Sequence, residues 1–173
     1  MIRSFNNKRP QIASSAFVSE AAYIVGDVEI GENSVVWPGA VIRGDFGKIK
    51  IGCNTAIEEN CVIHSGSLSG EGDVVIGDNV VIGHGAVLNC RRVGNNTLIG
   101  MNATILHDVE IGNFCVIAAA CVVSQGMKIP DRSFVVGVPG RIKGEVSPKL
   151  LLWTQSNPEY CSFIAKKYKE ELE

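Results

Sequence analysis

Residues 93–117 read Val93-Gly-Asn-Asn-Thr-Leu-Ile99-Gly-Met-Asn-Ala-Thr-Ile105-Leu-His-Asp-Val-Glu-Ile111-Gly-Asn-Phe-Cys-Val-Ile117. An aliphatic residue returns at every sixth position of this stretch. A period of six fits neither the 3.6-residue period of a helix nor a strand meander with irregular loops. Fixed short repeats are typical of solenoids, in which each repeat packs on its neighbours. The stretch therefore predicts a solenoid of short parallel strands.

The same spacing extends over most of the chain. The twenty aliphatic repeat positions are Ile12, Val18, Ile24, Ile30, Val36, Ile42, Ile51, Ile57, Ile63, Ile76, Ile82, Leu88, Val93, Ile99, Ile105, Ile111, Ile117, Val123, Ile129 and Val135. Three repeats of six make one triangular coil, so we expect about seven coils stacked at the spacing of hydrogen-bonded strands. The spacing breaks within residues 45–50 and 65–73, which predicts insertions at corners, and one residue is missing between Leu88 and Val93.

A small side chain stands two positions before most of these aliphatic residues, as a narrow interior requires. The small residues include Ser34, Ala40, Thr55, Cys61, Ala86, Thr97, Ala103, Cys115 and Cys121. Three of the six cysteines are therefore predicted to be core thiols. The other three, Cys53, Cys90 and Cys161, lack zinc-finger spacing, so we expect all six to be reduced, as in a cytosolic protein.

Composition narrows the function classes. The 173 residues are 46% hydrophobic but only 6% aromatic, which favours many short β-branched strands in one domain with a short appendage. A net charge of −2 makes nucleic acid and membrane surfaces poor candidate partners. The longest uncharged apolar stretch, Phe114 to Val123, is about half of what a membrane-spanning helix needs. The N-terminal residues lack the apolar stretch of a secretory signal, so we expect a cytoplasmic protein.

The repeats stop after Val135, and Gly137-Val-Pro-Gly140 is predicted to end the solenoid. The predicted organisation is a β-helix domain over residues 1–140 and a helical segment over 141–173. Ser147-Pro148 is typical of a helix start, and Asn157-Pro158 predicts the start of a second helix. The apolar stripe of this second helix consists of Tyr160, Phe163, Ile164, Tyr168 and Leu172. We expect the segment to pack on the solenoid or on a neighbouring subunit.

Four segments carry a family resemblance: Arg43-Gly-Asp45, Glu58-Glu-Asn60-Cys-Val-Ile-His64, Ile82-Gly-His-Gly-Ala-Val-Leu-Asn89 and Gly137-Val-Pro-Gly140. With the repeats, they resemble the γ-class carbonic anhydrase-like branch of the left-handed β-helix, hexapeptide-repeat superfamily. The resemblance implies an all-β solenoid with a C-terminal helical appendage, assembled as a homotrimer. It also implies a divalent metal at each subunit interface, with zinc favoured and iron or cobalt as alternatives. The implied activity is reversible hydration of CO2 by metal-bound hydroxide.

Successive repeats assigned to successive faces place the polar residues in two columns. Arg43, His64 and Asn89 each follow an aliphatic residue directly and stack on three consecutive coils. Glu59 and His84 form a second column on an adjacent face. Subunit packing in a trimer would bring the two columns together across an interface.

The resemblance implies three histidine ligands, two from one subunit and one from its neighbour. His64 and His84 match the first two, whereas Asn89 stands at the third position. An amide oxygen is a weak donor for zinc, so the ligand set is altered. His107 falls outside the first column, because the missing residue shifts it. The alternative for the two histidines is a pair of interface imidazoles that bond each other or Glu59.

The candidate catalytic residues are Arg43, Asp45, Glu58 and Glu59. Ala56, Glu58 and Glu59 stand where the family has Asn, Gln and Asp. Glu58 would ligate the metal or act as a general base, or it would form an interface pair with Arg43. Arg43 and Asp45 are either catalytic residues or a structural ion pair at the interface. Glu71 in the inserted loop resembles the family's proton-shuttling acid.

Three functions remain open from the sequence. The first is a γ-carbonic anhydrase or a relative that uses the same metal site for another hydration or hydrolysis. The second is an acyl-CoA-dependent transferase, since many hexapeptide-repeat proteins bind this cofactor between coils, although the fold alone is a weak argument. The third is a trimer without catalysis that serves as a structural or binding subunit.

Overall fold

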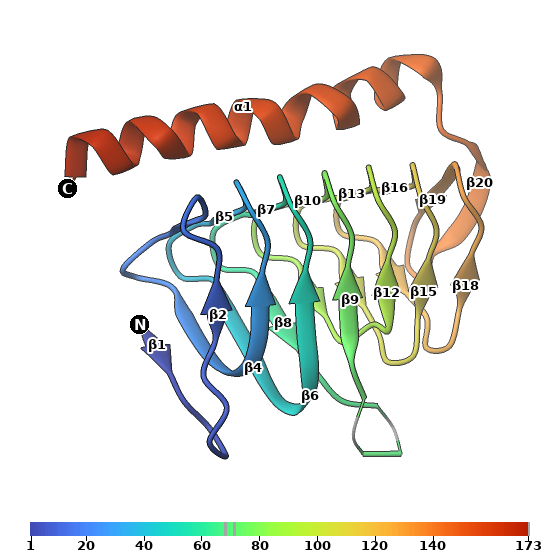
Figure 1. The fold of residues 1–173 in the computed structure, drawn as a ribbon. Helices are drawn as coiled ribbons and strands as arrows, with labels where there is room; N and C mark the ends of the chain where they lie inside the picture. The colour runs from blue at the N-terminus through green and yellow to red at the C-terminus, as the bar shows by residue number, and fades with distance from the viewer. Residues whose placement is uncertain (68, 71, 173) are drawn as a thin grey trace.

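The structure is a computed structural model that describes residues 1–67, 69–70 and 72–172, without the side chains of residues 153, 155–159, 161 and 172. It confirms the predicted solenoid. The chain winds into a left-handed parallel β-helix of about seven coils, and one helix lies along its side (Figure 1).

Three faces form the β-helix. The first face contains β3 (Phe17–Val18), β5 (Val35–Val36), β7 (Ala56–Ile57), β10 (Val81–Ile82), β13 (Leu98–Ile99), β16 (Val116–Ile117) and β19 (Ser133–Val136). The second face contains the first halves of β4 (Tyr23–Ile30) and β6 (Val41–Ile51), then β8 (Val62–His64), β11 (Val87–Leu88), β14 (Thr104–Ile105) and β17 (Val122–Val123). The third face contains β2 (Gln11–Ile12), the second halves of β4 and β6, β9 (Val74–Ile76), β12 (Arg92–Val93), β15 (Glu110–Ile111) and β18 (Lys128–Ile129). Strand β1 (Ile2–Arg3) pairs with β4.

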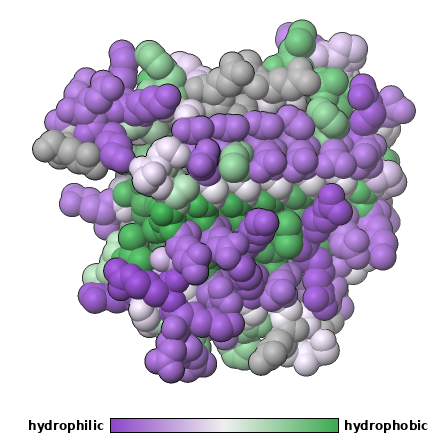
Figure 2. All heavy atoms as spheres, in the orientation of Figure 1, coloured by the Kyte–Doolittle hydropathy of each residue, from purple (hydrophilic) through white to green (hydrophobic). Residues whose placement is uncertain are grey.

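The aliphatic repeat residues pair with one another from coil to coil, as the six-residue spacing predicts. On the second face, for example, Ile42 pairs with Ile63, Ile63 with Leu88, and Leu88 with Ile105. These side chains are at most 1% exposed and form the core. Polar side chains cover much of the third face, where a hydrophobic band crosses the coils between them (Figure 2).

The first predicted corner insertion lies inside one long strand, β6, whereas the second separates β8 from β9. Strand β6 continues around the corner, so that Arg43 pairs with His64 of β8 while Ile51 pairs with Ile76 of β9. The second insertion contains a small bridge between Ser67 and Gly70. Both insertions therefore lie beside His64, at the corner between the second and third faces.

The predicted break at Asn157-Pro158 is wrong, because one helix, α1 (Pro148–Leu172), runs through both residues. An internal proline removes one backbone hydrogen bond and crowds the preceding turn. The helix continues because both of its halves pack on the first face: Leu150 lies against this face before the proline, and Ala165 after it. Residues 141–145 are also not helical: β20 (Arg141–Glu145) pairs antiparallel with β19.

The thiols agree with the prediction of a reduced protein as far as they are described. Cys53, Cys61, Cys90, Cys115 and Cys121 are free, and the side chain of Cys161 lies outside the description. The three predicted core thiols are fully buried. Burial raises the pKa of Cys61 to about 11, so this thiol stays protonated and unreactive at neutral pH. Within the described part of the chain, no helix is long and apolar enough to cross a membrane.

Replacing Ile99 by alanine tests the role of the aliphatic columns. Ile99 is fully buried between Ile82 and Ile117. We expect Ile99→Ala to lower the free energy of unfolding by about 2 to 5 kcal/mol, measured by urea denaturation, because it leaves a cavity. Val75 is 43% exposed, so Val75→Ala should cost less than about 0.5 kcal/mol. Equal losses in the two variants would contradict the assigned core.

Candidate functional site

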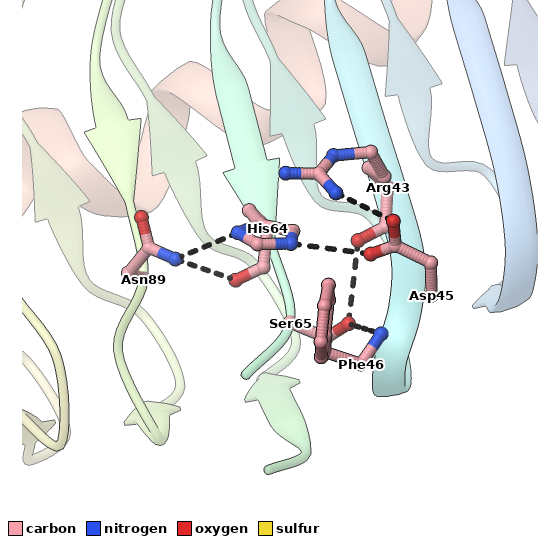
Figure 3. Close-up of polar contacts among 6 residues, drawn as sticks. All are labelled: Arg43, Asp45, Phe46, His64, Ser65 and Asn89. Atoms are coloured by element: carbon pink, nitrogen blue, oxygen red, sulfur yellow. Dashed lines mark hydrogen bonds and ion pairs between the residues drawn. The ribbon is translucent and has the colours of Figure 1, made fainter. Parts of the chain in front are cut away.

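The first polar cluster centres on His64, at the end of β8. Its ring Nε2 lies 3.1 Å from Asp45 Oδ1, and its Nδ1 lies 3.0 Å from Asn89 Nδ2 (Figure 3). Asp45 also forms an ion pair with Arg43. The register that pairs Arg43 with His64 and Leu88 with Ile63 confirms the predicted column of Arg43, His64 and Asn89.

The hydrogen bonds fix the tautomer of His64. An amide nitrogen only donates, so Nδ1 of His64 accepts the proton of Asn89 and Nε2 carries the ring proton toward Asp45. Asn89 Nδ2 also donates to the backbone oxygen of His64 at 3.4 Å, which holds the amide in this orientation. The side-chain oxygen of Asn89 therefore points away from His64 (Figure 3).

The charges around His64 favour its neutral form. Burial and the positive charge of Arg43 lower the pKa of His64, and Asp45 offsets only part of this effect. Burial acts to raise the pKa of Asp45, but the hydrogen bond and charge of Arg43 outweigh it, so the net pKa is lowered. The cluster thus holds an ionised Asp45 beside a neutral imidazole, the form of histidine that binds metals.

The second cluster lies around His84, in the turn between β10 and β11. His84 Nδ1 is 2.6 Å from Glu59 Oε2, and Nε2 is 3.1 Å from Glu58 Oε2. Glu58 Oε2 also accepts the backbone N–H of His84 at 3.0 Å. Burial raises the pKa of Glu58, although the positive charge of His84 acts against this. Within one chain, Glu58 therefore contacts His84, while Arg43 pairs with Asp45.

The two clusters lie at opposite edges of the second face. His84 lies in the turn before β11 and Asn89 directly follows this strand, so the width of the face separates them. Among the described residues, no three His, Cys, Asp or Glu side chains are grouped so that they would hold a metal ion. One chain therefore brings His64 and Asn89 together and His84 and the two glutamates together, but it does not join the two groups.

The remaining candidates from the sequence are His107 and Glu71, and two further residues contact the first cluster. Leu106 takes the next place in the first column, so His107 stays outside it, as predicted. Glu71 lies outside the described residues. Phe46 and Ser65 also belong to the first cluster, although the repeat pattern does not predict them. The Phe46 ring meets the His64 ring edge-on at 5.9 Å between centroids, and Ser65 Oγ accepts the backbone N–H of Phe46. An exposed aromatic inside an insertion, in a chain with few aromatics, is the signal that would have indicated Phe46.

Comparisons with known proteins agree with this fold and these motifs. The family described as bacterial transferase hexapeptide (six repeats) matches residues 9–44 and 92–125, and the hexapeptide repeat of succinyl-transferase matches residues 54–90. A probable carbonic anhydrase of Methanocaldococcus jannaschii is 47% identical over 79% of this chain and 84% of its own length. Gamma carbonic anhydrase 1, mitochondrial, of Arabidopsis thaliana is 34% identical over 95% of this chain. The chain spans 61% of the length of that plant relative.

Among solved structures, a putative acetyltransferase of Bacillus cereus is similar with a TM-score of 0.92 and 32% identity, covering 98% of this chain and 96% of its own. The chain belongs to the γ-carbonic anhydrase-like, hexapeptide-repeat family.

The pKa of His64 provides a test of the first cluster. In EDTA-treated protein, we expect an NMR titration to place it below the ordinary value of 6.5. Arg43→Gln should raise this pKa because it removes a nearby positive charge, and Asp45→Asn should lower it further. In the wild type, His64 of the unfolded chain takes up its proton at a higher pH than His64 of the folded protein. The free energy of unfolding should therefore fall as the pH drops just below 6.5. A pKa above 6.5 in the wild type would contradict the assigned contacts.

Proposed function

We propose that this protein catalyses the reversible hydration of CO2 at a divalent metal ion shared by two copies of the chain. His84 and Glu58 of one copy and His64 of another would hold the ion, in a homotrimer. The observation that supports this proposal is the position of the two imidazole clusters at opposite edges of one face. A site that needs both clusters is completed only when the edge of one copy meets the opposite edge of another.

The donors near His84 fit one ion. Ligand atoms bound to one metal at about 2.1 Å lie about 3 Å apart when their bonds are near a right angle. His84 Nε2 and Glu58 Oε2 are separated by 3.1 Å. Two imidazoles and one carboxylate are a recurrent ligand set for first-row divalent metals. Glu58 would thus supply the third donor and the negative charge that Asn89 lacks.

The neighbouring residues would orient these ligands. Glu59 accepts the Nδ1 proton of His84 at 2.6 Å. In the neutral imidazole, Nε2 then carries the lone pair that would bind the metal ion. A carboxylate behind a ligating histidine commonly has this role. On the other copy, Asn89 and Asp45 contact the two nitrogens of His64, so ion binding there would displace one of these bonds. A bound divalent ion supplies a nucleophile at neutral pH, because it lowers the pKa of water.

Loss of a ligand tests the activity. Protein loaded with zinc or ferrous iron should accelerate CO2 hydration in a stopped-flow pH assay, and His84→Ala should lower kcat/KM by about 100-fold or more. Val75→Ala changes an exposed side chain on the third face, away from both clusters, and serves as the control. Equal rates for the wild type and His84→Ala would overturn the proposal.

Mixed assemblies test the sharing between copies. His64→Ala and His84→Ala should each be inactive alone. When the two variants are co-expressed and mix at random in a trimer, about one quarter of the interfaces regain an intact His64 opposite an intact His84. The mixture should therefore recover about one quarter of the wild-type activity. No recovery in a confirmed mixed trimer would contradict a shared site.

The second candidate function is acyl transfer from acyl-CoA. The similarity to the Bacillus cereus structure, described as a putative acetyltransferase, favours it. Ligands that bind the native state raise the melting temperature. Under the proposed function, zinc raises Tm and acetyl-CoA leaves it unchanged, whereas the acyltransferase assignment predicts a rise with acetyl-CoA. A chain that responds to neither ligand would instead support a structural or binding role without catalysis.

A further inference from the structure

A largely apolar groove of about 410 Å³ begins at His84 and Glu58 and runs along the first face. It crosses the coils of β10, β13 and β16, which lie side by side beneath α1 (Figure 1). The volume lies within the range of pockets that bind small organic ligands, which is roughly 300 to 1,000 Å³. CO2 has three atoms and needs no such space.

The sequence produces this groove by placing small residues on consecutive coils. Glu58, Gly83, Gly100 and Ala118 each follow an aliphatic repeat residue and stack in register. From Gly83 to Ala118, the column has no side chain larger than a methyl group, so this part forms a floor. The wall on one side consists of the outward-facing Leu98, Val116 and Phe134, and Leu150 of α1 closes the far end.

The opposite wall begins with His84 and continues with Met101, which is 53% exposed. The groove therefore offers apolar contacts along its length and polar groups at one end only. These polar groups are His84 and Glu58 of the second cluster. A ligand with an apolar group in the groove would place its polar end beside His84.

The charged residues beside His84 determine which polar group of a ligand would fit at this end of the groove. Glu58 and Glu59 flank His84, and in the metal-free protein both would repel a free carboxylate. A neutral carbonyl group fits better, because it accepts a hydrogen bond and brings no negative charge. The carbonyl carbon is also the same kind of electrophile as the carbon of CO2.

We propose that the groove binds the apolar acyl chain of a neutral carboxylic ester, whose carbonyl group lies beside His84 and is hydrolysed there. This inference rests on the proposed function, since it assigns a second substrate class to the same site. Water adds to the carbonyl carbon, the bond from this carbon to the alkoxy oxygen breaks, and the proton released by water passes to the departing alcohol. The reaction needs no oxidant or further co-reactant.

Binding is tested first, in EDTA-treated protein, with hexanamide as a neutral carbonyl probe that is not hydrolysed. Each buried methylene strengthens binding by about fourfold, so hexanamide should bind at least about tenfold more tightly than acetamide in an NMR titration. Hexanoate should bind more weakly than hexanamide. Equal affinity for hexanamide and acetamide would overturn the proposal.

Two phenylalanine variants locate the probe. Ala118→Phe places a phenyl ring on the floor of the groove, where it takes up space that the probe would occupy. It should weaken hexanamide binding by about tenfold or more. Val75→Phe adds the same ring on the third face and should leave binding unchanged. If Ala118→Phe alters only the oligomeric state in light scattering and not the affinity, the groove is a contact between copies and the proposal is wrong.

Hydrolysis is then measured with the metal-loaded protein. The ratio of kcat/KM for 4-nitrophenyl hexanoate to that for 4-nitrophenyl acetate should fall in Ala118→Phe, while CO2 hydration stays unchanged. Hexanamide binding without CO2 hydration would overturn the proposed function and leave the groove supported. CO2 hydration without hexanamide binding would overturn the proposal that the groove binds an acyl chain, and would leave the proposed function supported.

Discussion

The constraint on which the structure depends is the in-register hydrogen bonding of each coil to the next. Short strands satisfy their backbone groups only through their neighbours, so each aliphatic residue lies directly over that of the preceding coil. The same register applies to every residue beside the aliphatic one. Arg43 and His64 therefore stack because their neighbours Ile42 and Ile63 stack. The placement of polar groups follows from the packing of apolar ones.

This register explains which parts of the molecule the sequence predicts. The twenty repeat positions identify the coils and both polar columns, since counting by six is enough to place them. Such counting does not predict the C-terminal helix α1. Pro158 indicates a break locally, but contacts of Leu150 and Ala165 with the first face keep one helix intact. The contact of Glu58 with His84 also escapes, because side-chain direction at a corner depends on the turn and not on the period.

The candidate site illustrates how a narrow solenoid limits one chain. Its interior is filled with aliphatic residues, so polar chemistry is confined to the corners and outer faces. His64 and His84 occupy different corners, separated by the width of a face. In the proposed assembly, corners from two copies would bring the His64 and His84 clusters together across a gap, which one copy does not do. The groove beside His84 adds an apolar surface to such a gap.

Strand β20 has a consequence for the ends of the molecule. A stack of parallel coils presents an open template at its last turn, on which another molecule would continue the winding into a fibre. Here the final strand, β20, reverses direction and pairs antiparallel with β19 (Figure 1). Its five residues, which include Arg141 and Lys143, are all exposed. On this face, an incoming parallel coil would meet an antiparallel strand with three charged side chains, those of Arg141, Lys143 and Glu145. The reversal thus prevents further parallel strand addition on the first face, where β19 ends the stack.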